Sequence, residues 1–232
     1  MRDARESPWR YLLSALLAFL FLGADMVSVL IGKLLDGRPL SDPQLWSTHW
    51  YATIGAFLCS VVIWAVFALV MLEWMRRRRV LGSLLQLPVD RNAAFVFIGS
   101  AAVLAMIAFL EAAWSGTTFP SLLAEYRGFG RQYPDHATVV TAFQYLYYLF
   151  ESVMVVLVIA FFQRAGELWT RSTRTPWGGI GLLLTWGAAH FGTHPEGAIA
   201  IVPVSLLFGI AFTLTRKSVI PAFVLVFLLF VF

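Results

Sequence analysis

The sequence has few charged residues and only one cysteine, and both shortages limit the kinds of protein it can be. Of its 232 residues 13% are charged, whereas soluble domains carry about 25%. The single cysteine, Cys59, excludes an intrachain disulfide and a zinc site built from cysteines. The chain also lacks the Gly-Lys-Ser/Thr of a phosphate-binding loop and the Gly-x-Ser-x-Gly of a serine hydrolase elbow. A disulfide scaffold is therefore excluded, and the common nucleotide-binding and serine hydrolase folds are disfavoured.

Hydrophobic residues are in excess and make up 59% of the chain. A domain of this size exposes too much surface to hide that excess in one soluble core. Lipid tolerates such a surface if every backbone N–H and C=O is paired inside the protein, which leaves helices or a closed barrel. Because the apolar runs are continuous rather than alternating, we predict an all-α bundle of transmembrane helices with the lipid bilayer as its first partner.

Seven runs approach the length of about 20 apolar residues that a transmembrane helix needs. We see no soluble domain, repeat or low-complexity tract, so residues 1–232 form a single membrane domain. The predicted spans are residues 11–33, 51–74, 92–114, 137–163, 177–193, 197–215 and 218–232.

Cations gather in alternate connections of this seven-span arrangement. With seven spans all the basic segments fall on one side, and the positive-inside rule places the N-terminus in the cytoplasm. The opposite side includes the connection 115–136, whose tyrosines are typical of a membrane interface. Topology and lipid headgroups account for the net charge of +4, so we expect no nucleic-acid partner. The basic segments contain Arg2, Arg5, Arg10, Arg76, Arg77, Arg78, Arg79, Arg164, Arg171, Arg174, Arg216 and Lys217.

Ionisable groups inside predicted spans are costly and mark candidate functional sites. The sequence places Asp25, Glu111, Glu151 and His190 there. At 1.5 Å per residue, Glu151 and His190 lie about 18 and about 20 Å from the cytoplasmic ends of their spans. These spans are consecutive and antiparallel, so the two groups should share one level, with Asp25 near it and Glu111 closer to the outer face.

A buried glutamate and histidine at one level have two interpretations. They form an acid–base site, in which the carboxylate takes a proton from water and the imidazole stabilises the reacting groups. Alternatively they form a structural hydrogen bond that ties two helices together. His190 and His194 also have the i, i+4 spacing of zinc ligands, but no HExxH pattern is present and Pro195 ends the helix. We therefore expect no metal and no cofactor.

Three features of the C-terminal region occur in a characteristic order. Glu151 lies in a long apolar helix, and Trp186 and His190 form an aromatic-x-x-x-His pattern. A glycine-bearing helix, a basic turn and Pro221 follow. In these features residues 145–232 resemble the CAAX-protease and bacteriocin-processing (CPBP) family of intramembrane glutamic endopeptidases. The resemblance implies a multi-pass protein of a bacterial or archaeal cell membrane.

The resemblance further implies that Glu151 activates water and that His190 helps to bind or stabilise the attacked carbonyl. The substrate would be a peptide, a prenylated protein or a membrane protein. Four other positions depart from the family, because its second glutamate, arginine, second histidine and asparagine correspond here to Ser152, Val156, Leu225 and Leu229. Leucine donates no hydrogen bond to an oxyanion, and the loss of one such donor costs about 10²–10³ in rate.

Two functions therefore remain open. The chain is a divergent endopeptidase that recruits Asp25, Glu111 or His194 to its site, or it is a non-catalytic scaffold, maturation or immunity factor. The missing donors favour the second function, whereas the matching depths of the acid and the imidazole favour the first.

Overall fold

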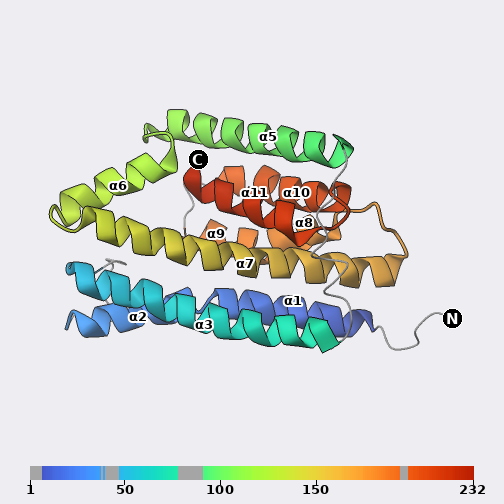
Figure 1. Ribbon diagram of the computed structural model, residues 1–232, viewed down its shortest axis with the longest axis horizontal. Coiled ribbons are helices and arrows are strands. Elements are labelled where there is room, and N and C mark those ends of the chain that lie inside the picture. The colour runs from blue at the N-terminus through green and yellow to red at the C-terminus, as the bar shows by residue number, and fades with distance from the viewer. Residues whose placement is uncertain (1–6, 38, 40–46, 78–90, 194–197) are drawn as a thin grey trace.

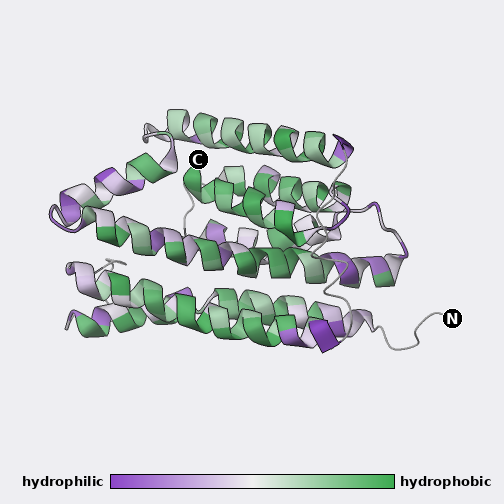
Figure 2. Cartoon of the chain, in the orientation of Figure 1, coloured by the Kyte–Doolittle hydropathy of each residue, from purple (hydrophilic) through white to green (hydrophobic). Residues whose placement is uncertain are grey.

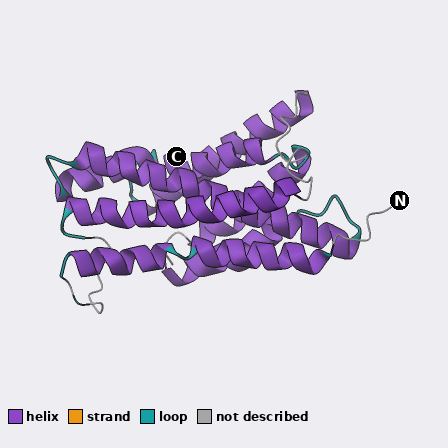
Figure 3. Ribbon diagram, turned by 60° about the horizontal axis from the view of Figure 1, so that its bottom comes forward, coloured by secondary structure: helices purple, strands orange, loops and turns teal. Residues whose placement is uncertain are grey.

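Helices form all the regular structure in the part of the chain that the computed structural model describes, which is residues 7–37, 39, 47–77, 91–193 and 198–232 (Figure 3). The all-α prediction is confirmed, and each of the seven apolar runs is helical over most of its length. The helices are α1 (Pro8–Leu22), α2 (Asp25–Leu35), α3 (Trp50–Arg77), α5 (Arg91–Ser115), α6 (Ser121–Gln132), α7 (Ala137–Thr170), α8 (Trp177–Leu182), the π-helix η1 (Leu183–Gly187), α9 (Ala188–Thr193), α10 (Ala198–Leu214) and α11 (Val219–Val231).

Among the described residues, four helical stretches are long and apolar enough to cross a membrane: Pro8–Leu35, Trp50–Arg77, Arg91–Ser115 and Ala137–Thr170. Helices α10 and α11 are also apolar but shorter. Hydrophobic residues run along the middle of the bundle and polar residues collect toward its ends (Figure 2). This distribution is compatible with an integral membrane protein in contact with a lipid bilayer.

Helix α7 is the central element of the bundle, and most other helices pack on it (Figure 1). Helices α1 and α3 cover one side of α7, whereas α8 and α11 cover the other. Helix α5 is outermost and rests on α10 and α11, and α6 slants from the end of α5 to the start of α7. Residues in the middle of α7 are therefore enclosed on both sides, as a buried site requires.

The first apolar run is interrupted at Gly23 and Ala24 between α1 and α2. A helix interruption inside lipid is tolerated only if the freed backbone groups find partners. The indole Nε1 of Trp64 on α3 supplies one, because it donates to the Phe21 carbonyl at 2.7 Å. The interruption places Asp25 in the first turn of α2, midway along the bundle.

Glycines bring α8 unusually close to its neighbours. A methyl group on Gly178 would lie 2.6 Å from the Ile159 carbonyl oxygen of α7. One on Gly179 would lie 2.8 Å from the Ser205 carbonyl oxygen of α10. The sequence Gly178-Gly179-x-Gly181 thus allows the close helix approach that small residues favour in membranes. It fixes the segment that carries Trp186 and His190 against α7.

A buried carboxylate, that of Glu167, secures the end of the bundle where α7 finishes. Lys217, in the turn between α10 and α11, places Nζ 2.6 Å from Glu167 Oε1. Gln163 donates to the same oxygen at 2.8 Å and accepts the Gly178 backbone N–H at 2.9 Å. Both Arg216 and Lys217 have left-handed backbone conformations, with φ of 57° and 59°. Such conformations are costly for residues with a side chain, so the ion pair helps to hold this turn.

Candidate functional site

Glu151 occupies the middle of α7, where three elements meet. Its side chain is buried, and the residue is 8% exposed. Asp25 of α2 acts on its carboxyl group electrostatically, and Tyr147 lies one turn earlier within the influence of both carboxyls. The indole N–H of Trp186, from η1, is the neighbouring donor. A low-dielectric interior makes each of these interactions stronger than it would be in water.

Trp186 connects Glu151 to His190. The ring centroids of Trp186 and His190 are 4.1 Å apart, and His190 Nδ1 lies 2.9 Å from the Trp186 carbonyl oxygen. A carbonyl oxygen only accepts, so Nδ1 carries the hydrogen and Nε2 has the lone pair in the neutral ring. The imidazole is thereby held in the tautomer whose Nε2 takes up or returns a proton.

Trp186 itself lies in the π-helical segment η1. Single π turns inside α-helices occur often at functional sites, because the extra residue per turn redirects the side chains around it. The Trp186 indole Nε1 is buried, and among the described residues it completes no hydrogen bond of ordinary geometry. It acts on the Glu151 carboxyl from nearby. This N–H is therefore a buried donor positioned beside a buried acid.

The structure places the predicted site residues as follows. Glu151 and His190 each lie near Trp186, and Asp25 of α2 acts electrostatically on Glu151. Direct pairing of the Glu151 carboxyl with the His190 ring stays a prediction. Glu111 is exposed on α5, a helix that packs on α10 and α11. His194 lies outside the described residues.

At the positions where the chain departs from the CPBP pattern, the side chain is either apolar or already hydrogen-bonded to the backbone. Leu225 is 1% exposed and Val156 is 4% exposed, so both fill the core. The Ser152 hydroxyl donates to the Tyr148 carbonyl of its own helix at 2.7 Å. Leu229 is only partly buried. These four side chains therefore offer no free donor to a developing negative charge, and the Trp186 indole and the His190 imidazole are candidate donors.

The site contains acid and base groups in place of a metal-ligand set. Over residues 7–37, 47–77, 91–193 and 198–232, no group of three or more His, Cys, Asp or Glu side chains is placed to hold a metal ion. A carboxylate with a nearby lone-pair nitrogen and a buried N–H donor has the parts of general acid–base chemistry.

A second buried polar cluster lies on α7 on the N-terminal side of Glu151, and it was not predicted from the sequence. The Tyr148 hydroxyl donates to Glu125 Oε1 of α6 at 2.6 Å, and Gln144 Nε2 donates to the same hydroxyl at 2.8 Å. Burial raises the pKa of Glu125 to about 7. Residues 144, 148 and 151 have the spacing of one helix face, which is the signal that would have found this polar stripe on α7.

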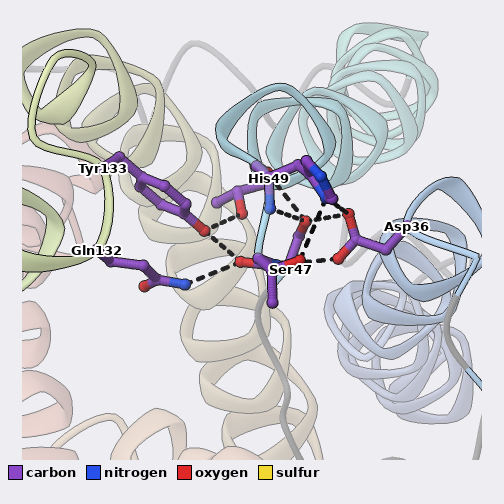
Figure 4. Close-up of polar contacts among 7 residues, drawn as sticks. Asp36, Ser47, His49, Gln132 and Tyr133 are labelled. Atoms are coloured by element: carbon purple, nitrogen blue, oxygen red, sulfur yellow. Dashed lines mark hydrogen bonds and ion pairs between the residues drawn. The ribbon is translucent and has the colours of Figure 1, made fainter.

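A third network, at the same end of the bundle as α6, contains a serine, a histidine and an aspartate (Figure 4). The Ser47 hydroxyl donates to Asp36 Oδ1 at 2.5 Å, and His49 Nδ1 lies 3.0 Å from that same oxygen. In a nucleophilic triad the serine hydroxyl bonds instead to the ring nitrogen that faces away from the carboxylate. Gln132 and Tyr133 both donate to the Ser47 carbonyl, Gln132 at 2.8 Å. This network therefore joins α2, α3 and the α6–α7 turn and is not a hydrolase site.

The candidate site consists of the Glu151 carboxyl and the His190 imidazole, which both lie near Trp186, and of the Asp25 carboxyl, which acts on Glu151 electrostatically. No family model matches the chain, and comparison with curated proteins and with solved structures finds no match.

Proposed function

We propose that the chain is a divergent intramembrane endopeptidase of the CPBP type, with Glu151 as the general base and His190 as its partner. The observation that carries the proposal is the position of Trp186, whose indole acts on the Glu151 carboxyl of α7 and lies 4.1 Å, between ring centroids, from the His190 imidazole of α9. The substrate is a membrane-associated peptide, a prenylated protein or a segment of a membrane protein. The protein acts in a bacterial or archaeal cell membrane.

The arrangement of the helices supports seven crossings with a cytoplasmic N-terminus. Successive apolar segments alternate in direction (Figure 1). Most of the described basic residues lie near the start of α1, the end of α3, the start of α5, the end of α7 and the turn between α10 and α11, which share one end of the bundle. The positive-inside rule makes this end cytoplasmic. The described basic residues at this end are Arg10, Arg76, Arg77, Arg91, Arg164, Arg171, Arg174, Arg216 and Lys217.

The length of α7 supports a site near the middle of the bilayer. Its 34 residues extend over about 51 Å, whereas the hydrocarbon core of a bilayer is about 30 Å thick. Both ends of α7 therefore reach the headgroup regions, and Glu151 lies near its centre. A peptide bond would have to enter the bundle to reach this carboxylate.

The chemistry follows from the groups present. Ionised Glu151 takes a proton from a water molecule, and the resulting hydroxide attacks the scissile carbonyl carbon. The Trp186 N–H and a protonated His190 Nε2 are the donors that would stabilise the developing oxyanion. The proton held by Glu151 passes to the leaving amine when the C–N bond breaks, which regenerates the carboxylate.

A non-catalytic scaffold, maturation or immunity factor is the second candidate function. It is favoured by Leu225, which is 1% exposed at a position where the CPBP pattern has a histidine. An apolar side chain there removes a donor that hydrolysis would use, while it keeps the bundle well packed. In this case Glu151 and Trp186 serve to bind a partner or to fix the helices.

Cleavage of membrane-inserted peptides tests the proposal. Wild-type protein and the Glu151→Gln, His190→Ala and Glu111→Gln variants are reconstituted in liposomes with a mixture of transmembrane and prenylated peptides, and the products are identified by mass spectrometry. We expect cleavage to fall by at least about 10²-fold in the first two variants and to persist in the third, because Glu111 is exposed on α5. Equal cleavage by wild type and Glu151→Gln would contradict the proposal. Folded wild-type protein that cleaves no peptide would favour the scaffold.

A further inference from the structure

The second polar cluster on α7, here called the Glu125 cluster, joins three helices. It consists of Glu125 of α6, Gln144, Tyr145 and Tyr148 of α7, and the backbone carbonyl of Phe230 in α11. The Tyr145 hydroxyl donates to the Phe230 carbonyl at 2.8 Å and also lies within the electrostatic influence of Glu125. The Phe230 ring stacks on Tyr148 with centroids 4.3 Å apart and an angle of 7°. The cluster is thus a set of oxygens enclosed by aromatic rings.

The donor groups of the cluster make hydrogen bonds, whereas two of its acceptor oxygens receive none. Gln144 donates to Tyr148, Tyr148 donates to Glu125, and Tyr145 donates to the Phe230 carbonyl. Glu125 Oε2 and Gln144 Oε1 are buried, and within the described part of the chain neither completes a hydrogen bond of ordinary geometry, although the Tyr145 hydroxyl acts on the Glu125 carboxyl from nearby. Gln144 as a whole is only 8% exposed. Buried acceptors without a donor are costly, so the group that belongs here is a donor or a cation.

Charge and size narrow the choice of occupant. The cluster has one carboxylate, and α11 contributes no ionisable side chain because residues 219–231 contain none. One negative charge is balanced by one positive charge, and carboxylate, amide, hydroxyl and carbonyl oxygens suit hard cations. Both oxygens without partners are buried, so the occupant is small.

We propose that the Glu125 cluster binds a small monovalent metal cation, with sodium as the best fit. The Glu125 carboxylate and the Gln144 amide oxygen are its main ligands, and the hydroxyls of Tyr145 and Tyr148 lie beside them. Binding would link α6 to α7 and α11 at the end of the bundle opposite the basic end. The inference does not depend on Glu151 acting as a base.

A proton on Glu125 is the competing occupant, because it would supply the missing donor itself. Burial raises the pKa of Glu125 to about 7, so proton and cation compete near neutral pH. The groups that face Glu125 from α7 are Tyr145 and Tyr148, and Glu151 lies further along the same helix. Since the pKa is raised on folding, protonated Glu125 stabilises the fold at low pH. That contribution is lost as the pH rises through about 7.

Thermal unfolding of the purified full-length chain in detergent tests the proposal. The midpoint is compared in sodium chloride and in choline chloride of equal ionic strength, at about pH 8.5 and about pH 5.5. We expect sodium to raise the midpoint by at least about 3 °C at the higher pH and to have no effect at the lower pH. In choline the midpoint should fall as the pH rises through about 7.

Two variants and a second cation make the test specific. Glu125→Gln removes the charge but retains an acceptor for Tyr148, so we expect both the sodium effect and the fall with pH to disappear. Glu111→Gln, on the exposed face of α5, should keep both. A midpoint that falls with pH but is equal in sodium and choline would show that a proton alone fills the cluster and would overturn the proposal. A larger shift with methylammonium chloride than with sodium chloride would overturn it as well, in favour of an organic ammonium ion.

Discussion

The contact between α8 and α10 is close enough for one added methyl group to separate the two helices. In Gly179→Ala the new Cβ would lie 2.8 Å from the Ser205 carbonyl oxygen and 3.0 Å from Gly209 Cα. Ordinary contacts lie at 3.4–4 Å and both neighbours are backbone atoms, so the helices must move apart by roughly 0.5 Å. Overpacking of this kind lowers the free energy of unfolding by about 2–3 kcal/mol. The better helix propensity of alanine offsets about 1 kcal/mol of that loss. We expect a net loss of about 1–2 kcal/mol in the free energy of unfolding.

Equilibrium unfolding in mixed micelles of a mild detergent and sodium dodecyl sulfate, followed by tryptophan fluorescence, measures this loss. Gly99→Ala on α5 is the matched control, since a methyl group there meets nothing within 4 Å. It should leave the free energy of unfolding unchanged or raise it by up to about 1 kcal/mol. Equal shifts for Gly179→Ala and Gly99→Ala would refute the close contact between α8 and α10.

Three further predictions concern the ends of the bundle. Glu167→Ala leaves Lys217 without its partner at 2.6 Å and should lower the free energy of unfolding by about 2–3 kcal/mol, measured in the same micelles; a change below the error of the assay would contradict a stabilising ion pair. Tyr133→Phe removes a buried hydroxyl that bonds to α3 and to the preceding segment, and should cost about 1–2 kcal/mol in that assay; an unchanged value would mean that the hydroxyl does not hold these elements together. Single cysteines introduced at Thr117 and at Thr173, in a variant that lacks Cys59, should lie on opposite sides of the membrane. A membrane-impermeant maleimide added to intact cells should therefore label only residue 117. Labelling of residue 173 would contradict a cytoplasmic basic end.

The helices of the bundle follow from local sequence, and their irregularities do not. Continuous apolar runs predict helices because lipid requires backbone groups to be paired within each segment. The interruption at Gly23 is stabilised by Trp64, which lies on another helix and is not indicated by the local sequence pattern. The helix α6, inside the connection 115–136, depends in the same way on contact with α7 through Glu125 and Tyr148.

The sequence predicts a common level for the residues of the candidate site but does not predict which residues connect them. Counting residues along two antiparallel spans puts Glu151 and His190 at one depth, since helix rise is uniform. It does not reveal that Trp186 connects them, because the π turn of η1 changes the direction of the side chains. Asp25 was a candidate from its cost in lipid, whereas Glu125 was missed because it lies outside the apolar runs and becomes buried only when α6 packs on α7.

The distance between the Glu151 carboxyl carbon and the His190 ring nitrogens tests the proposed acid–base site most directly. Solid-state NMR of the chain in lipid bilayers, with ¹³C in glutamate and ¹⁵N in histidine, measures it by dipolar recoupling, and Glu151→Gln assigns the signal. The same experiment with ¹⁵N-labelled tryptophan gives the Glu151–Trp186 contact as an internal reference. We expect both couplings, with a carboxyl-to-imidazole distance within about 6 Å. Coupling to Trp186 without any coupling to His190 would contradict a shared acid–base site and leave a helical membrane protein whose buried acid has another purpose.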